Sequence, residues 1–253
     1  MPTRSAMNHH SSRATACLFP LALASSLSAA TSITLHPVAD AFVSAANPTG
    51  NFGGGGALGI SAAGLPKGEL QALMMFDFSA ARTQLDAAYG AGGWLVDSLS
   101  LQLTASTAGN PVFNTSAGGN MAVRWFDDDS WTEGSGTPAG PAVPGVNFNS
   151  LAALFASGTE AVGSFAFGGG TSGITAVTLT SLGGLQADIL AGRTASLDFH
   201  ATDATASGVF NSRSFTTAAN RPVLTLTASA VPETSTGLLA LLAITVPALR
   251  RRR

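Results

Sequence analysis

Residues 70–78 read LQALMMFDF and residues 99–103 read LSLQL, and these two stretches decide the fold class. In the second stretch leucine alternates with polar residues, which is the period-two pattern of a strand with one buried face. The first stretch is short and apolar almost throughout, as in a strand that is covered on both faces. Both stretches predict a β protein.

The same kind of pattern continues through residues 31–230, which we expect to form one domain. The chain contains 29 glycines, and only 10% of its residues are charged, against about 25% in ordinary soluble proteins. This composition is typical of short strands joined by tight turns. Further strands are expected at 196–201, at 222–228 and around Phe165 and Phe167, and short connecting helices at 80–88, 150–156 and 182–191.

The charge of this domain bears on its partners. Between residues 31 and 230, six Lys or Arg stand against 13 Asp or Glu, a net charge of −7. A protein follows a phosphate backbone with clustered Lys and Arg, so nucleic acid is excluded as a partner. The single cysteine, Cys17, precedes the domain, which therefore has neither a disulfide nor thiol chemistry.

Residues 1–30 have the layout of a secretory signal peptide. Arg4 and Arg13 precede an apolar run at 16–27 (ACLFPLALASSL), and small residues follow, which predicts cleavage after Ala30.

The other end of the chain, residues 231–253, has the pattern of a second targeting signal. Val231, Pro232 and Glu233 precede an apolar run at 237–249 (GLLALLAITVPAL), and four arginines follow. This layout resembles the PEP-CTERM sorting signal of Gram-negative bacteria, although Thr234 stands where that family has proline. The resemblance implies a short transmembrane helix, handling by an exosortase-type protease at the inner membrane, and release to the cell surface or extracellular matrix alongside exopolysaccharide.

A second resemblance covers most of residues 33–228. The domain is similar to the DNRLRE-type domain, on the residues ADAFV at 39–43, NFG at 51–53, LGI at 58–60, LMMFDFS at 73–79, DSWTE at 129–133 and RPVLTL at 221–226. The resemblance implies a jelly-roll-type β-sandwich, and relatives of that family include carbohydrate-binding modules. The expected fold class is thus all-β, with a signal segment before the sandwich and a hydrophobic helix after it.

Two residues of these motifs are expected to have local structural roles. Gly53 is expected to adopt a positive φ in the turn after Phe52. The strand end Asp77-Phe78-Ser79 is expected to cap the helix that follows it, with Ser79 as a good N-cap.

The densest group of acids is formed by Asp127, Asp128, Asp129 and Glu133. One interpretation is a Ca²⁺ site, because calcium prefers oxygen ligands on flexible loops. The other interpretation is a solvated turn. The sequence indicates no other cofactor.

Sugar binding requires exposed aromatic rings, and the candidates are Trp131, in a polar turn, and Trp94. Packing in the core is the default interpretation of any single tryptophan, and exposure is the alternative.

Together these features favour an exported, non-catalytic surface or matrix protein that binds extracellular polysaccharide. The alternatives are a polysaccharide-active enzyme on the same scaffold, in which His200 or an acid would be essential, and a coat protein that self-assembles through its sheet edges.

Overall fold

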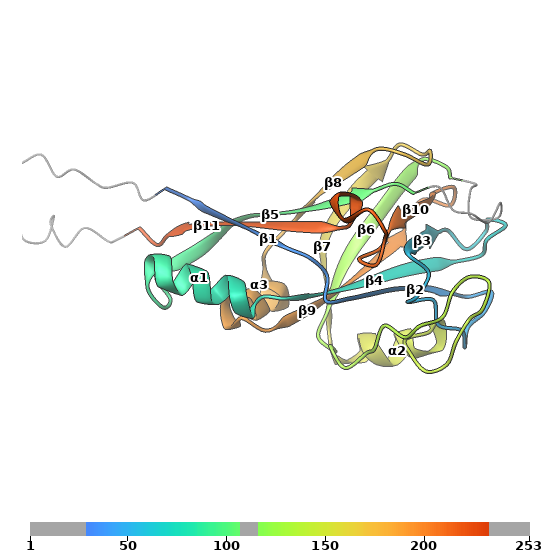
Figure 1. Cartoon of the computed structure of the whole chain (residues 1–253), viewed down its shortest axis with the longest axis horizontal. Coiled ribbons are helices and arrows are strands. Elements are labelled where there is room, and N and C mark those ends of the chain that lie inside the picture. The colour runs from blue at the N-terminus through green and yellow to red at the C-terminus, as the bar shows by residue number, and fades with distance from the viewer. Residues whose placement is uncertain (1–28, 107–115, 233–253) are drawn as a thin grey trace, which may run out of the picture. The chain divides into compact units, whose positions relative to one another are not determined.

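A computed structural model describes residues 29–106 and 116–232, and these form an antiparallel sandwich of two sheets (Figure 1). The smaller sheet has the strand order β1-β11-β5-β8. Its strands are β1 (Thr31–Leu35), β11 (Val223–Ala230), β5 (Trp94–Thr104) and β8 (Ile174–Leu179).

The larger sheet has seven strands in the order β10-β3-β4-β9-β6-β7, with β2 paired to β4. Its strands are β2 (Ala39–Ser44), β3 (Ala57–Ser61), β4 (Leu70–Asp77), β6 (Gly119–Phe126), β7 (Thr159–Phe167), β9 (Thr194–Ala201) and β10 (Ser207–Asn211). The predicted all-β sandwich is confirmed.

The main core lies between the two sheets. The alternating Leu99, Leu101 and Leu103 of β5 are all buried there, against residues of the larger sheet such as Phe76 and Phe199. The intervening polar residues of β5 point away from this core, as the period of two requires.

A second core covers the opposite face of the larger sheet. Leu73 and Met75 of β4 belong to it, whereas Met74 and Phe76 belong to the main core. The covering side chains come from the segment between β6 and β7, and they include Trp131 and Leu154. This arrangement explains why residues 70–78 are apolar almost throughout: both faces of β4 are buried.

The helices lie where short Ala- and Leu-rich stretches predicted them. They are α1 (Ser79–Tyr89), α3 (Gly183–Ala191) and a single turn, α2 (Leu151–Leu154), flanked by the 3-10 turns η1 (Phe148–Ser150) and η2 (Phe155–Ser157). A third 3-10 turn, η3 (Ala218–Asn220), precedes β11. Arg82 of α1 donates a hydrogen bond to the carbonyl oxygen of Ala191, which links α1 to the end of α3.

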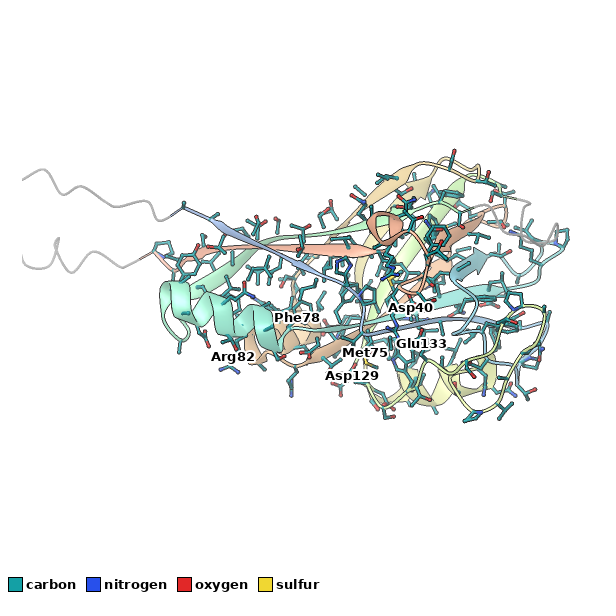
Figure 2. The ribbon with its side chains drawn as sticks, viewed as in Figure 1. Asp40, Met75, Phe78, Arg82, Asp129 and Glu133 are labelled. Atoms are coloured by element: carbon teal, nitrogen blue, oxygen red, sulfur yellow. The ribbon has the colours of Figure 1, made fainter. Side chains whose placement is uncertain are left out.

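The start of α1 differs from the prediction. The helix begins at Ser79, with Phe78 in the cap position and no side-chain hydrogen bond from either residue to the helix start. Instead, Oδ1 of Asp77 accepts the backbone N–H of Ser79 at 2.8 Å. The predicted segment thus caps the helix through Asp77, whereas the prediction that Ser79 is the N-cap is wrong because Ser79 is the first helical residue. Phe78 and Arg82 are labelled along this segment in Figure 2.

Both proposed targeting signals lie largely outside the described residues. These residues omit the signal segment up to Ser28 and, of the sorting tail, Glu233 and the apolar run at 237–249. Within 29–106 and 116–232, no helix is long and apolar enough to cross a membrane.

Candidate functional site

The four acids expected to bind calcium have separate partners. Oδ1 of Asp128 accepts the backbone N–H of Ser130 at 2.8 Å, and hydrogen bonds from Ser130 lower the pKa of Asp128. Oδ1 of Asp129 accepts the hydroxyl of Ser196 at 2.5 Å, while Asp127 is exposed. These acids therefore point to different groups rather than to a shared centre.

Glu133, the fourth acid, forms an ion pair. Its Oε2 accepts hydrogen bonds from two nitrogens of Arg213, with Nε at 2.7 Å. No group of three or more His, Cys, Asp or Glu among the described residues is arranged to hold a metal. The calcium interpretation is thus a prediction that the geometry does not support, because Asp128, Asp129 and Glu133 each already accept a hydrogen bond from a protein donor.

Asp40 lies beside this ion pair (Figure 2). Its side chain is fully buried, and Oδ2 accepts the backbone N–H of Arg213 at 2.6 Å, while Oδ1 has no partner among the described residues. Burial raises the pKa of Asp40 to about 7, and the bond from Arg213 opposes that shift. Asp40 and Glu133 thereby hold the chain that leaves β10.

The two tryptophans are not exposed platforms. Trp131 is 7% exposed, and its Nε1 donates to the hydroxyl of Ser196 at 2.9 Å. Trp94 is 4% exposed, and its Nε1 donates to Asp86 at 2.8 Å. Both rings thus pack in the core, which was the default interpretation of a single tryptophan, and Trp131 is not the exposed candidate because the turn that carries it folds back over the larger sheet. A sugar ring needs an open aromatic face, so neither ring is available for stacking in this conformation.

Asn51 is the buried centre of the same loop region. Its Nδ2 donates to the carbonyl oxygens of Glu133 at 2.6 Å and Val146 at 2.8 Å. Its Oδ1 accepts the N–H groups of Gly53 at 3.1 Å and Gly136 at 3.2 Å. The side-chain amide therefore joins three segments that are distant in sequence, which is a structural role.

The glycines near Asn51 allow this close packing. A Cβ at Gly53 would lie 2.1 Å from the carbonyl oxygen of Glu133, and one at Gly134 would lie 2.1 Å from Oδ1 of Asn51. Gly53 is not among the glycines with positive φ. Glycine is thus required at position 53 for the close approach of another backbone, and the expected positive φ is wrong.

His200 is oriented by a buried acid. Oδ2 of Asp198 lies 2.8 Å from Nδ1 of His200 and 2.7 Å from NH2 of Arg124. Asp198 is fully buried, and the Arg124 guanidinium also lies 3.9 Å from the ring centre of Phe155. The carboxylate of Asp198 in β9 pairs with Arg124 in β6, and Arg124 stacks on Phe155 of the segment between β6 and β7. These contacts tie that segment, which covers the second core, to the larger sheet.

An open cleft lies where the two sheets meet at one end of the sandwich. Beyond β5, Ala105 forms an isolated bridge with Phe210 of β10, and the N–H of Ser106 donates to the carbonyl oxygen of Val209 at 2.8 Å. The cleft has a volume of about 490 Å³, within the 300–1,000 Å³ range usual for small-molecule sites. Its described lining consists of Thr104, Ala105, Ser106, Thr171, Ser172, Gly173, Ile174, Asn211, Phe215 and Asn220.

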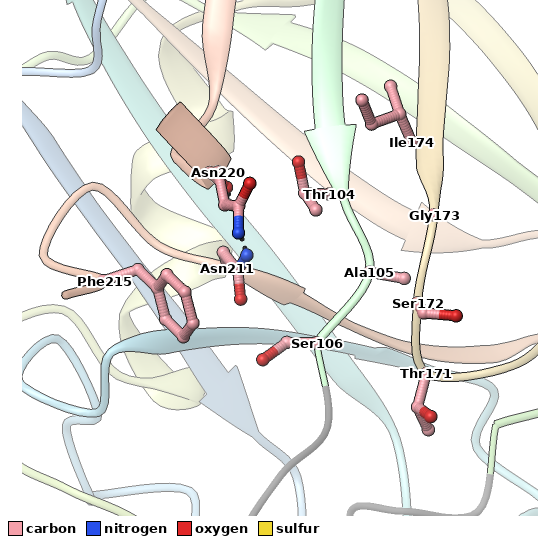
Figure 3. A pocket seen from close by; sticks show the side chains of 10 residues that line it. All are labelled: Thr104, Ala105, Ser106, Thr171, Ser172, Gly173, Ile174, Asn211, Phe215 and Asn220. Carbon is pink, nitrogen blue, oxygen red and sulfur yellow. Dashed lines mark hydrogen bonds between the residues drawn. The ribbon is translucent and has the colours of Figure 1, made fainter. Parts of the chain in front are cut away.

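Figure 3 shows two walls of this cleft: the residues of β5 and of the start of β8 on one side, and Asn211, Phe215 and Asn220 on the other. The polar groups of the lining are hydroxyls and side-chain amides, and Ile174, which is 65% exposed, and Phe215 add apolar surface. None of the described lining residues is ionisable.

Two polar side chains of the lining are buried and incompletely paired. Asn211 is 2% and Thr104 9% exposed, and Oδ1 of Asn211 and Oγ1 of Thr104 have no hydrogen-bond partner among the described residues. An unpaired buried polar atom costs about 1–3 kcal/mol, so a water or a ligand hydroxyl that reaches these atoms is stabilised.

The second wall is held in place from behind. The N–H of Phe215 donates to the carbonyl oxygen of Ser212 at 3.1 Å, and Nε of Arg221 donates to the carbonyl oxygen of Phe215 at 2.8 Å. Together with the bond from Arg213 to Asp40, these contacts fix the segment before a ligand arrives, which lowers the entropy cost of binding.

This cleft has no signature in the sequence. Its residues come from separate parts of the chain, and each is a Ser, Thr, Asn, Gly or single apolar residue of the kind found in any turn. Three long-range contacts bring them together: the pairing of β5 with β8, the bridge from Ala105 to Phe210, and the bond from Asn211 to Asn220.

Of the proposed sorting motif, Val231 and Pro232 are exposed directly after β11, and the N–H of Val231 donates to the carbonyl oxygen of Gly93 at 2.9 Å.

The fold and the cleft define an all-β sandwich with a neutral, polar groove. No protein-family model and no curated protein matches the chain.

Proposed function

We propose that this protein is an exported, non-catalytic component of the cell surface or extracellular matrix, and that its sandwich binds polysaccharide in the cleft between β5, β8 and β10. The composition of the cleft carries the proposal. Hydroxyl and carboxamide groups pair with sugar hydroxyls, and a ring and a branched aliphatic chain pack against the apolar faces of a pyranose.

The described lining favours binding over hydrolysis. A glycosidase requires two carboxyl groups about 5–10 Å apart across the scissile bond, and the described lining contains no carboxylate and no imidazole. The enzyme alternative therefore needs a different site, and His200 with Asp198 is the pair to test for it.

The ends of the sequence support export and sorting. The segment 1–30 has the charge and apolar pattern of a signal peptide, and 231–253 resembles a PEP-CTERM tail. Val231 and Pro232 are exposed at the end of the last strand, where an exosortase-type protease can reach them. We place the mature protein outside the inner membrane on these grounds.

A jelly-roll connectivity and kinship with the DNRLRE-type domain are parts of the same proposal. The contacts of Asn51 support them, because they give a structural reason for two of the quoted motifs: Asn51 and Gly53 of the first pack against the backbone of Glu133 in the second.

Affinity electrophoresis tests the proposal. The purified chain is run through native gels with and without the exopolysaccharide of the producing organism, beside the variants Phe215→Ala and Ile174→Ala. We expect the polysaccharide to retard the parent protein and to retard both variants much less.

The matched control is Leu182→Ala, because Leu182 is 62% exposed, close to the 65% of Ile174, but does not line the cleft. It is expected to be retarded like the parent. Equal mobility of the parent protein in both gels overturns the proposal.

A further inference from the structure

The cleft also indicates which class of polysaccharide it takes. Resting on the proposed function, we infer that it selects uncharged glycan segments and rejects chains that carry uronate, sulfate or phosphate groups. Three observations support this: the groups that line the cleft, the pairing of the nearby cations, and the charge of the domain.

The described lining offers only neutral partners. Its hydrogen-bonding side chains are those of Thr104, Ser106, Thr171, Ser172, Asn211 and Asn220. An anionic group that enters such a cleft loses water without gaining a cation, and burial of an unpaired charge costs more than burial of a hydroxyl. A sugar hydroxyl, in contrast, both donates and accepts and can therefore pair with either kind of group.

The cations that lie close to the cleft in sequence are already engaged. Arg213 is paired with Glu133, and its own N–H is held by the buried Asp40. Arg221 directs its Nε to the carbonyl oxygen of Phe215. Neither arginine belongs to the described lining.

The domain as a whole repels polyanions. Residues 31–230 carry six basic and 13 acidic residues. A net negative protein slows the approach of a negatively charged chain and weakens its binding at low ionic strength. The local lining and the overall charge therefore act in the same direction.

The unpaired buried oxygens provide a reason for hydroxyl recognition. Oγ1 of Thr104 and Oδ1 of Asn211 have no partner among the described residues, and both are able to accept a hydrogen bond from a neutral donor that reaches them. Ile174 and Phe215 at the rim supply the apolar contact that orients a sugar ring.

The test is affinity electrophoresis of the full chain in gels that contain one polysaccharide each. The neutral probes are a β-glucan, a mannan and a galactomannan, and the acidic probes are alginate, polygalacturonate and a sulfated galactan. Retardation by at least one neutral probe and by no acidic probe is the expected result.

Two variants separate charge in the cleft from charge elsewhere. Ser172→Lys places a cation at an exposed position of the lining, and Thr178→Lys places the same cation at an exposed position of β8 outside the lining. We expect Ser172→Lys to weaken neutral binding about tenfold, the equivalent of 1.4 kcal/mol, and to gain retardation by acidic probes. Thr178→Lys is expected to behave like the parent protein.

The other outcomes are distinguishable. Retardation of the parent protein by any acidic probe, with or without a neutral one, overturns the inference while keeping polysaccharide binding. Equal gains by the two lysine variants also overturn it, because the selection then comes from the overall charge and not from the cleft. Absence of retardation with every probe and with the native exopolysaccharide overturns both the inference and the proposed function.

Discussion

Nδ2 of Asn211 donates a hydrogen bond to the backbone carbonyl oxygen of Asn220 at 3.1 Å, and this bond ties the last residue of β10 to the turn that leads into β11 (Figure 3). Because both residues belong to the second wall of the cleft, the bond holds that wall together.

Asn211→Asp is expected to open this wall. The substitution keeps the shape of the side chain but replaces the donor by an acceptor that faces a carbonyl oxygen, in a position that is 2% exposed. We expect a loss of stability of about 1–3 kcal/mol and loss of retardation by polysaccharide, measured by urea unfolding and by affinity electrophoresis. Asn220→Ala is the control for stability, since the bond uses the backbone oxygen of residue 220; if it destabilises the protein equally, the bond is not the cause.

Asn51→Ala is expected to destabilise the domain strongly. The substitution leaves two carbonyl oxygens and two N–H groups without their partner in a fully buried position. We expect a loss of about 3–5 kcal/mol in the free energy of unfolding, measured by urea denaturation. A loss below about 1 kcal/mol would show that the loop does not depend on this amide.

Gly53→Ala tests the close approach of two backbones. The added methyl group would lie 2.1 Å from the carbonyl oxygen of Glu133, so one segment must move. A matched control is Gly64→Ala, where nothing lies within 4 Å of the added Cβ. We expect the melting temperature to fall for the first variant and to stay within error for the second; equal melting temperatures would refute the contact.

Asp40 makes stability depend on pH. Its pKa rises from the ordinary 3.8 to about 7 in the folded protein because the carboxyl is buried. Between these values the folded state holds a proton that the unfolded chain has released, so this group's contribution to stability is complete below about pH 4 and is lost as the pH rises through 7. Asp40→Asn keeps an acceptor for the N–H of Arg213 and does not titrate.

The measurement compares melting temperatures of the two proteins at pH 5 and pH 8. We expect the parent protein to lose more stability than Asp40→Asn over this interval. Parallel curves would mean that Asp40 is ionised, or neutral, throughout.

Calcium is expected to leave the protein unchanged. Asp128, Asp129 and Glu133 each accept hydrogen bonds from protein donors, so calcium gains no ready set of ligands. Melting curves with calcium and with EDTA are expected to coincide. A rise in melting temperature with calcium that Glu133→Gln abolishes would restore the calcium interpretation.

The strands and helices that were predicted from the sequence are those with a local pattern. Leu99, Leu101 and Leu103 show the period of β5, and the dense apolar run of β4 showed that both of its faces are covered. The helices at 80–88 and 182–191 were recognisable because alanine and leucine dominate them. In contrast, β10 reads SGVFN and is buried at all five positions, so it has no alternation to detect.

The site could not be predicted, for a physical reason. Burial of Trp131 depends on a segment that folds back over the sheet, and its polar neighbours in sequence carry no sign of that contact. The cleft depends on the pairing of Ala105 with Phe210, a contact between residues far apart in the chain. Side chains that act through such long-range register leave no motif of fixed spacing.

The most direct test of polysaccharide binding in the cleft is to map the bound glycan on the protein by NMR. Backbone amide shifts of the isotope-labelled chain are followed while the polysaccharide fragment that gives retardation is added. Binding in the cleft should concentrate the shifts at residues 104–106, 171–174, 211, 215 and 220 and leave those around Trp131 and Trp94 unchanged. Shifts centred on Trp131 or on His200, with the cleft residues unmoved, would contradict it.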